Sequence, residues 1–265
     1  MIDRSFLVRL IGFPATLIHH DLLVLDRWMW LRRRLPRTRN GERLVDIGCG
    51  SGGFTIGAAR RGYAAVGLSW DRRNQQVAAE RAALCGVTLV EFPIQDVRAL
   101  DEHTEFRQAF EVAICLENIE HILDDRKLMR DINRCLKPGG MLLLTTPNYF
   151  YRAITSGDDG PFSRTEDGGH VRRGYTAAGL RELCTESGFF VEEISSCSGF
   201  FSQKLTAFMR VVERPSRLLG WGVILPLRLL PLLFDPLLAR LTGWPDYSIC
   251  LVAIKPRFDR EIHIN

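Results

Sequence analysis

Residues 43–62 read Arg-Leu-Val-Asp-Ile-Gly-Cys-Gly-Ser-Gly-Gly-Phe-Thr-Ile-Gly-Ala-Ala-Arg-Arg-Gly, and this stretch decides the fold. An apolar strand over residues 44–47 leads into four glycines, after which residues 54–61 follow a helical pattern that Gly62 is expected to end. Glycine has no Cβ, so the backbone can turn sharply and approach a ligand closely. A strand, a glycine loop and a helix N-terminus in this order predict a nucleotide-type site at the carboxyl edge of a parallel sheet.

The loop resembles motif I of the class I S-adenosylmethionine (SAM)-dependent methyltransferases, an acidic residue followed by Gly-x-Gly-x-Gly. The resemblance implies a SAM site that includes the strand-end acid and the loop after it: Asp46, Gly48, Cys49, Gly50 and Gly52. The Asp46 carboxylate could accept hydrogen bonds or meet a cation. The same glycines with Gly53 also fit Gly-x-Gly-x-x-Gly, the dinucleotide fingerprint, so an NAD(P)-dependent oxidoreductase is the alternative. A turn without any ligand is disfavoured because each glycine costs backbone entropy.

Length and composition fit an ordinary globular protein. The chain has 265 residues, 46% hydrophobic and 25% charged, enough for one large α/β domain with additions or two small domains. Its seven cysteines form no Cys-x-x-Cys pair, which favours reduced thiols in a cytoplasm-like compartment. The N-terminal apolar run is interrupted by Pro14, two histidines and Asp21, so no cleavable signal peptide is expected.

Positive charge is concentrated in two segments. Residues 1–39 carry eight Arg against three Asp, and residues 204–245 carry six Lys or Arg against two acids, within a net charge of +4. Both segments are also rich in Leu, Phe and Trp. This combination favours peripheral contact with an anionic membrane surface, at the inner face, over nucleic acid. The alternative is a set of amphipathic helices that pack on the core with Arg outward.

The rest of the chain alternates strands and helices. We expect one or two helices in residues 1–40, a turn at residues 137–140, further helices over 74–84, 125–136 and 177–187, and strands over 64–68, 87–92, 110–116, 141–146, 189–195 and 248–254. This order predicts an α/β fold with a doubly wound, mostly parallel seven-stranded sheet, the Rossmann-like fold of the methyltransferases.

Four parts of the chain are expected. Residues 1–40 form an N-terminal helical segment, 41–195 the SAM-binding core, 196–246 an apolar helical insert, and 247–265 the last strand and a tail. The insert has no run of about 20 apolar residues, so a spanning helix is not expected, and Pro226, Pro231 and Pro236 are expected to break it. We expect short apolar helices that serve as a lid, a homodimer face or a membrane-surface element.

Two further stretches are candidates for the nucleoside. Gly-Leu-Ser69-Trp70-Asp71 follows the second expected strand, where SAM and NAD enzymes carry a ribose-binding acid. It resembles the variant of cyclopropane-synthase-like members, which implies ribose contact by Ser69, Asp71 or Gln75. Trp70 would stack on adenine or belong to the core, and Asp71 would alternatively cap the next helix. Asp96 and Val97, after the third strand, resemble the adenine-binding segment; otherwise Asp96 bonds its own loop.

The segment Glu117-Asn-Ile-Glu120-His121 follows the fourth expected strand, at the same edge. With Leu-Lys-Pro-Gly-Gly at 136–140 and Thr-Thr-Pro-Asn at 145–148, it resembles methyltransferases and favours SAM over NAD. Glu117 would lie at the cofactor. If the turn is helical, its offsets put all three side chains on one face. The spacing resembles ubiquinone-pathway O-methyltransferases and small-RNA 3′-end methyltransferases, which implies a Mg²⁺ or Mn²⁺ site completed by His170. Packing or metal-free base catalysis is the alternative.

These observations predict a SAM-dependent methyltransferase of the ubiquinone-pathway O-methyltransferase type. The expected acceptor is small or lipid-linked: an isoprenoid quinone, a glycolipid or a glycan precursor. The expected catalytic residues are Glu120, His121 and His170, with one histidine as the base that takes a hydroxyl proton. Glycine-rich residues 148–176 would form a mobile loop over the substrate. The alternatives are the oxidoreductase and a catalytically silent SAM-fold subunit that docks a partner through the insert. Nucleic acid is disfavoured because the core lacks basic charge.

Overall fold

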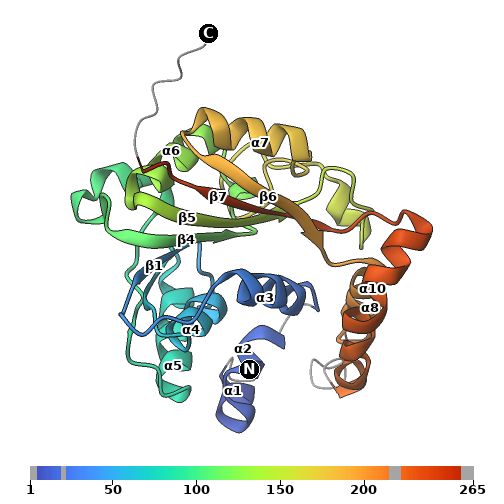
Figure 1. Cartoon of the computed structure of the whole chain (residues 1–265). Coiled ribbons are helices and arrows are strands. Elements are labelled where there is room, and N and C mark those ends of the chain that lie inside the picture. The colour runs from blue at the N-terminus through green and yellow to red at the C-terminus, as the bar shows by residue number, and fades with distance from the viewer. Residues whose placement is uncertain (1–4, 19–21, 215–221, 258–265) are drawn as a thin grey trace.

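The computed structural model describes residues 5–18, 22–214 and 222–257. Within them, seven strands form one sheet in the order β3-β2-β1-β4-β5-β7-β6 (Figure 1). Strands β1 to β6 run parallel, and β7 is antiparallel to both of its neighbours. The strands are β1 Arg43–Ile47, β2 Ala64–Leu68, β3 Val90–Glu91, β4 Phe110–Leu116, β5 Leu136–Pro147, β6 Phe190–Cys197 and β7 Ser248–Ile254. The expected mostly parallel, seven-stranded sheet is confirmed.

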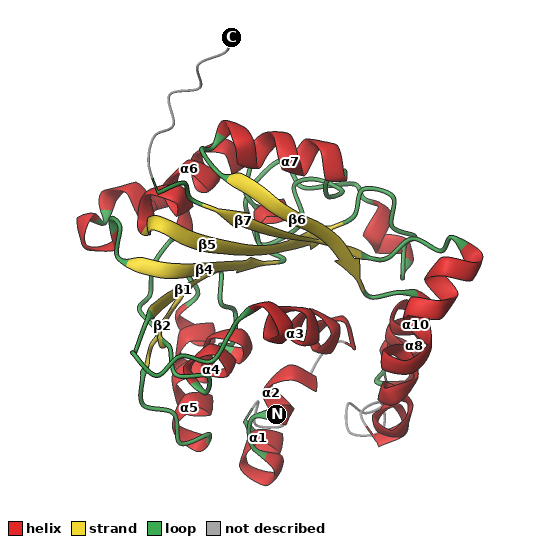
Figure 2. Ribbon diagram, viewed as in Figure 1, coloured by secondary structure: helices red, strands yellow, loops and turns green. Residues whose placement is uncertain are grey.

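Helices cover both faces of the sheet (Figure 2). Those described are α1 Phe6–Ile11, α2 Pro14–Ile18, α3 Leu22–Arg34, α4 Gly53–Ala59, α5 Arg72–Leu84, α6 Asp125–Cys135, α7 Ala177–Glu186, α8 Phe200–Val212 and α10 Leu229–Thr242. Short 3-10 turns are η1 Val97–Glu102, η2 Thr104–Phe106, η3 Ile119–His121, η4 Ser156–Asp159 and η5 Leu225–Arg228. Helices α3 to α5 lie on one side and α6 and α7 on the other, the doubly wound arrangement.

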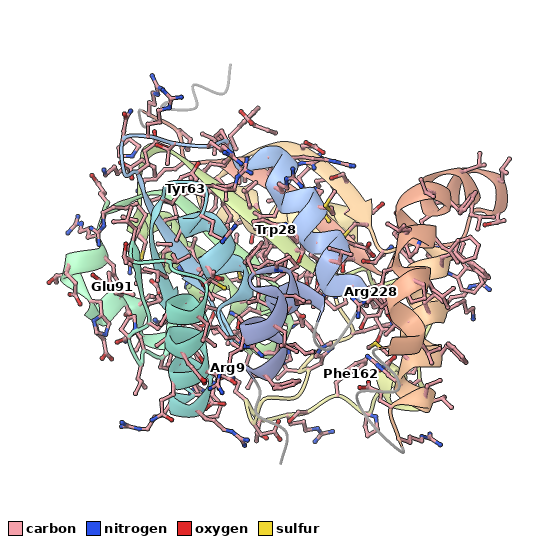
Figure 3. The ribbon with its side chains drawn as sticks, turned by 90° about the horizontal axis from the view of Figure 1, so that it is seen from below. Arg9, Trp28, Tyr63, Glu91, Phe162 and Arg228 are labelled. Carbon is pink, nitrogen blue, oxygen red and sulfur yellow. The ribbon has the colours of Figure 1, made fainter. Side chains whose placement is uncertain are left out.

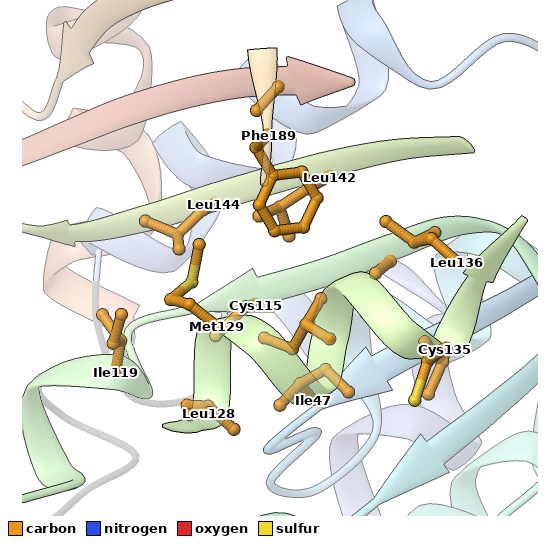
Figure 4. Packing of buried hydrophobic residues seen from close by; sticks show 14 of the residues in the cluster. Ile47, Cys115, Ile119, Leu128, Met129, Cys135, Leu136, Leu142, Leu144 and Phe189 are labelled. Carbon is orange, nitrogen blue, oxygen red and sulfur yellow. The ribbon is translucent and has the colours of Figure 1, made fainter. Parts of the chain in front are cut away.

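Alternation along the strands produces two cores. Val45 and Ile47 of β1 belong to the cluster that α6 and α7 complete with Met129 and Leu180, and Figure 4 shows this packing around Met129. Leu44, the residue before Val45, points to the opposite cluster with residues of α3 and α4. Because successive side chains of a strand point to opposite faces, a sheet covered on both faces needs such continuous apolar runs.

Several expected boundaries are corrected. Three helices, rather than one or two, precede β1 in the described residues, and the third strand covers only Val90–Glu91 instead of 87–92. The expected turn at 137–140 lies inside β5, where Gly139 has φ +82° and the pairing with β4 shifts register. Pro231 and Pro236 do not break α10. Pro231 lies in the first turn of α10, where a backbone N–H would have no acceptor within the helix, so proline is tolerated there. Pro236 removes one hydrogen bond without ending the helix.

The apolar segment before β7 contains α8, η5 and α10. None of the described helices combines the length and apolarity that crossing a bilayer would need. The switch in strand order lies between β1 and β4, because the chain proceeds to one side of β1 and then returns to the other. In doubly wound sheets, ligands bind at the carboxyl ends of the strands beside this point.

Gly57 seats the N-terminal helices on the core. A Cβ at Gly57 would lie 2.4 Å from two ring carbons of Trp28 and 3.0 Å from the ring of Phe13. The Trp28 side chain therefore lies directly on the backbone of α4 (Figure 3), and α3 is held against the element that follows the glycine loop.

We expect Gly57→Ala to destabilise the protein. The added methyl must displace the Trp28 ring, and overpacking of this kind costs about 1–3 kcal/mol, in part offset by the better helix propensity of alanine. Urea unfolding measures the change. Gly157→Ala is the matched control, because a Cβ at Gly157 meets nothing within 4 Å and its expected effect is below about 0.5 kcal/mol. Equal stability of the two variants would contradict the packing described.

Candidate active site

The glycine loop brings the ends of β1 and β4 together. Gly48 has φ +80°, and a Cβ there would lie 2.2 Å from Oδ1 of Asn118. The backbone N–H groups of Gly48 and Cys49 both donate to the carbonyl of Leu68, at the end of β2. The loop is thereby fixed to its two neighbouring strands, and only glycine leaves room for the Asn118 side chain.

Asp46 stabilises this loop from beneath. Its carboxylate is buried and accepts a 2.6 Å hydrogen bond from Oγ1 of Thr55 on α4. Burial raises the pKa of Asp46 to about 7, against an ordinary value of 3.8. Asp46 does not line the cleft described below. The expected hydrogen-bond acceptor is therefore present, with its partner on the same strand–loop–helix unit.

Cys49 and Gly52 also lie behind the loop. The Cys49 thiol is 3.2 Å from Oε1 of Gln75, whose Nε2 donates to the carbonyl of Gly67. Gln75 is thus occupied within the core and away from the cleft. A Cβ at Gly52 would lie 2.7 Å from Cβ of Ala78, so this glycine allows α4 and α5 to pack closely.

A cleft of about 420 Å³ opens at the switch point between β1 and β4. Its volume falls in the range of small-molecule sites. Most of the expected cofactor residues line it together: Gly48, Gly50, Ser69, Trp70, Asp71, Asp96, Val97 and Glu117. Asn118 also lines it, and its Nδ2 is buried without a hydrogen-bond partner among the described residues. Sequence reasoning did not single out Asn118, although it lies between the candidates Glu117 and Glu120.

The end of β2 supplies an exposed aromatic ring. Trp70 is 60% exposed at the cleft, so it does not belong to the core. The Asp71 carboxylate caps α5 by accepting from the backbone N–H of Arg73 and Asn74, as the alternative interpretation predicted. Ser69 is buried, and its hydroxyl accepts from the N–H of Asp71. Ser69 therefore occupies the position where a ribose-binding acid is usual, and the nearest carboxylate, that of Asp71, caps α5.

Asp96 bonds within its own loop, and its partner Arg98 links that loop to a distant one. It accepts from the backbone N–H and the guanidinium of Arg98, which lowers its pKa. Arg98 also donates to Glu166 at 2.7 Å, and Glu166 accepts from the N–H of Leu123. Residues 163–173 thus form a strap that lies across the cleft and is tied to it by Arg98 and Leu123.

Glu117 is separated from the other two residues of its motif. It has φ +51° and lies outside η3, so the three side chains do not share one helical face as expected. Its carboxylate is 3.0 Å from Nη2 of Arg27 and accepts from the hydroxyls of Thr145 and Ser248. Arg27 lies on α3 and is buried. Sequence reasoning missed this arginine because only the tertiary fold brings α3 to the end of β4.

Glu120, His121 and His170 do come together. One potential ligand atom from each lies within 4.8 Å of the others, and the two imidazole rings meet edge to face with centroids 4.6 Å apart. The strap places His170: the N–H of Val171 donates to the carbonyl of Glu120, and Nδ1 of His121 is 3.0 Å from the carbonyl of Gly169. Since a carbonyl only accepts, Nδ1 of His121 carries a proton, and Nε2 of the neutral ring has a free lone pair.

The Glu120 carboxyl is the least satisfied group of this cluster. It is fully buried, and Thr146 donates to Oε2, whereas Oε1 has no hydrogen-bond partner among the described residues. Burial and the nearby Glu117 charge raise its pKa well above the ordinary range. Oε1 lies 3.9 Å from Nε2 of His121. Burial, followed by the proximity of His121, lowers the pKa of His170 to about 4, so that ring is neutral near pH 7.

A second cavity, also about 420 Å³, is lined by His170. Its walls include Tyr151, Phe162 and Tyr247, with Asp158 and His170 at the polar side. It shares Asp167 with the first cleft. His121 lines the first cleft and His170 the second, so the histidine pair stands between a cleft lined by the expected cofactor residues and a cavity lined in part by aromatic rings.

Comparison with known proteins decides the family. A model of the methyltransferase-domain family matches residues 24–194, well over half of the chain. The protein belongs to the class I SAM-dependent methyltransferases. This membership favours SAM over the dinucleotide that the glycine pattern alone allowed.

Relatives of this methyltransferase include ubiquinone biosynthesis O-methyltransferases. It is 33% identical over 129 residues to that of Pseudomonas fluorescens (strain SBW25), covering 49% of this chain and 53% of the relative. It is 28% identical over 159 residues to that of Aeromonas salmonicida (strain A449), covering 58% and 66%. The chain spans about half to two thirds of the length of these curated relatives.

Solved structures share the fold of the methyltransferase. Haemonchus contortus phosphoethanolamine N-methyltransferase 2, in complex with SAM, has a TM-score of 0.64 and 20% identity, covering 97% of this chain and 60% of that one. The [4+2]-cyclase SpnF has a TM-score of 0.60 and 21% identity, covering 95% and 94%. At these identities the likeness shows the fold alone, and the two proteins, a cyclase and an N-methyltransferase, catalyse different reactions.

We expect Thr55→Val to destabilise the methyltransferase more at high pH than at low pH. The raised pKa of Asp46 means that the folded protein keeps a proton that the unfolded chain releases near its ordinary value of 3.8. The resulting stability is present below that value and is lost as the pH rises through about 7. Losing the Thr55 donor removes support from the ionised form, at a cost of about 1–3 kcal/mol.

Urea unfolding at about pH 5 and about pH 8 measures this difference. Thr185→Val is the control, because the Thr185 hydroxyl is exposed and donates to the carbonyl of Arg181 on the same helix. A penalty for Thr55→Val that does not change with pH would refute the link to Asp46.

Proposed function

We propose that this protein transfers the methyl group of SAM to the hydroxyl oxygen of a small or lipid-linked acceptor. Family membership and the O-methyltransferase relatives support methyl transfer. The observation that carries the proposal is the position of Glu120, His121 and His170 between two cavities. That arrangement offers one side to a cofactor and the other to an acceptor, with a base between them.

The first cleft fits a nucleoside with a charged tail. Trp70 offers an exposed ring face for adenine stacking, and Asp96 lies where an exocyclic amine could donate to it. The unpartnered Nδ2 of Asn118 offers a hydrogen bond at the switch point. SAM, when bound, would supply an electrophilic sulfonium methyl. Gly48 and Gly50 would allow its close approach to the loop.

His121 is proposed as the base. Its Nδ1 is oriented by the carbonyl of Gly169, which leaves Nε2 to accept the proton of an acceptor hydroxyl. As the oxygen–methyl bond forms, the sulfur–methyl bond breaks and its electron pair stays on sulfur, leaving S-adenosylhomocysteine. The nearby Glu120 carboxyl would stabilise the imidazolium that results, since Oε1 lies 3.9 Å from Nε2 and has no other partner among the described residues.

The second cavity is proposed as the acceptor site. Tyr151, Phe162 and Tyr247 would contact the apolar part of the acceptor, and His170 would direct its hydroxyl toward His121. An isoprenoid quinone precursor, a glycolipid or a polyprenyl-linked glycan precursor would each place a polar head there. The relatives named above are ubiquinone biosynthesis enzymes, which supports the first class for this chain.

A divalent cation is a further proposal for the same cluster. Glu120, His121 and His170 would hold it, and the orphaned Oε1 of Glu120 fits a cation ligand. Glu117 does not belong to the set, because Arg27 already neutralises its carboxylate. Two imidazoles with one carboxylate suit Mn²⁺ better than Mg²⁺. Such an ion would lower the pKa of a bound hydroxyl.

A catalytically silent subunit is the second candidate. The cyclase with the same fold illustrates that this architecture does not fix the reaction.

Tritium transfer from methyl-labelled SAM to a total lipid extract tests turnover. We expect label in a lipid that resists mild alkali, as a methyl ether does and a methyl ester does not. Retained SAM binding without any labelled product would favour the silent subunit.

We expect S-adenosylhomocysteine, but not NADH, to raise the melting temperature, because only a ligand of the folded state does so. Trp70→Ala should weaken S-adenosylhomocysteine binding about tenfold, or roughly 1.4 kcal/mol, through lost stacking. Isothermal titration calorimetry measures this. Trp244→Ala is the control, since Trp244 lies outside the cleft. Stabilisation by NADH alone would refute the cofactor assignment.

We expect His121→Asn to lower the methyl-transfer rate by roughly 100-fold or more, with S-adenosylhomocysteine affinity changed much less. His103→Asn, in the loop between η1 and η2, should retain full activity. If Mn²⁺ is bound, it raises the melting temperature of the wild-type protein and not that of His170→Asn. An unchanged melting temperature with Mn²⁺, together with full activity after chelation, would refute the proposed metal site and leave His121 as the proposed base.

A further inference from the structure

Apolar side chains gather on the outer surface of α8, η5 and α10. Among the described residues, twenty large hydrophobic side chains are strongly exposed, and nine of them lie between residues 208 and 241. These nine are Phe208, Val211, Val223, Leu225, Leu229, Leu233, Phe234, Leu237 and Leu241. Figures 1 and 2 show α8 and α10 side by side, projecting beyond the sheet. Such a concentration marks an interaction surface rather than scattered surface leucines.

One face of α10 is a leucine stripe. Leu229, Leu233, Leu237 and Leu241 recur at every fourth position and are 62%, 67%, 56% and 72% exposed. Side chains four apart lie on the same side of a helix. On the other side, Asp235 is buried and accepts from the backbone N–H groups of Phe201 and Ser202 at the start of α8. The buried carboxylate thus holds the two helices together and leaves the leucines outward.

Charge around this hairpin of α8 and α10 is positive on the outside. Lys204 and Arg214 are exposed. Among described residues 200–214 and 222–243, the acids are Glu213, which is half-buried, and the buried Asp235. Lys204 also lies over the Trp244 ring, 4.9 Å from its centroid. An apolar stripe with cations and an aromatic ring beside it matches the boundary between lipid headgroups and acyl chains.

We propose that the outer face of α8 and α10 docks on an anionic lipid bilayer, with the leucine stripe of α10 in the headgroup–acyl boundary. A second copy of the chain is a poorer occupant. A twofold interface uses the same patch on both copies, so it would bring the cations of both copies, Lys204 and Arg214, into one interface without acids to compensate them. Anionic lipid instead neutralises them. Because no described helix is fit to span a bilayer, the contact is with its surface.

The docking face is connected to the proposed acceptor cavity. Arg210 of α8 donates to Oγ1 of Thr155 and lies 3.6 Å from Asp158, which lines that cavity. A lipid-linked acceptor would therefore pass from the bilayer to the cavity over a short path along the hairpin. This connection rests on the proposed function, whereas docking itself does not.

Vesicle co-sedimentation tests the proposal. We expect the wild-type protein to bind phosphatidylcholine vesicles that contain about one third phosphatidylglycerol, and to bind pure phosphatidylcholine weakly. High salt should reduce the binding to anionic vesicles. The double variant Leu233→Glu/Leu237→Glu should lower the partition coefficient at least about tenfold, because two leucines that would enter the bilayer are replaced by charged groups. Arg214→Glu should weaken binding to the anionic vesicles only.

Leu84→Glu/Leu89→Glu is the matched control, since both leucines are exposed away from the hairpin, and it should bind as the wild type does. Thermal unfolding checks that all variants fold. The proposal is overturned if wild-type protein ignores anionic vesicles or if the hairpin variant binds them equally. It is also overturned if light scattering shows a wild-type dimer that the hairpin variant dissociates, without vesicle binding. Vesicle binding without methyl transfer would refute the proposed function alone.

Discussion

The absence of a side chain at Gly48 is the constraint on which the site depends. Asn118 occupies the space that a Cβ would fill, so the ends of β1 and β4 can meet at the point where the strand order reverses. The cleft opens directly above this contact. A larger residue would separate the two strand ends and move the Asn118 amide, the Glu117 carboxylate and the η3 turn together, because all three follow β4 within a few residues.

The two glutamates after β4 show how tertiary partners assign different states to similar residues. Glu117 receives an arginine and two hydroxyls, so its charge is compensated. Glu120 receives one hydroxyl at one oxygen, and its other oxygen has no partner among the described residues. A buried carboxyl in that condition is stable only as the acid, or beside a cation. The cluster with His121 and His170 is therefore suited to receive a proton or a metal ion, whereas Glu117 is suited to hold a fixed position.

Local patterns were sufficient for most of the sheet and for the cofactor side of the site. The apolar runs of β2, β4 and β7 predicted their bounds, and the glycine loop predicted the strand–loop–helix unit. The strand before Gln95 was overestimated because its residues are apolar without forming a ladder beyond Val90–Glu91. Arg27 and Ser248 could not be predicted, since they reach Glu117 from α3 and β7 through pairings that no local pattern encodes. The prediction that Glu117 shares a helical face with Glu120 and His121 was wrong because the backbone of Glu117 has a positive φ, which is not helical.

The strap formed by residues 163–173 has a kinetic consequence. It crosses the cofactor cleft and is tied to the far wall through Arg98 and Glu166, whose side chains are 42% and 18% exposed. This ion pair is partly exposed, so it contributes only about 0–1 kcal/mol and is screened by salt. The strap is also held by the N–H of Val171, which donates to the carbonyl of Glu120, and by Arg172, which donates to the carbonyls of Ile122 and Leu123. Opening of the strap for nucleoside exchange therefore has to break these hydrogen bonds together, and only the Arg98 tie should weaken as ionic strength rises. The same opening carries His170 away from His121. The time for which a nucleoside stays bound would therefore also be the time for which the two histidines stay together.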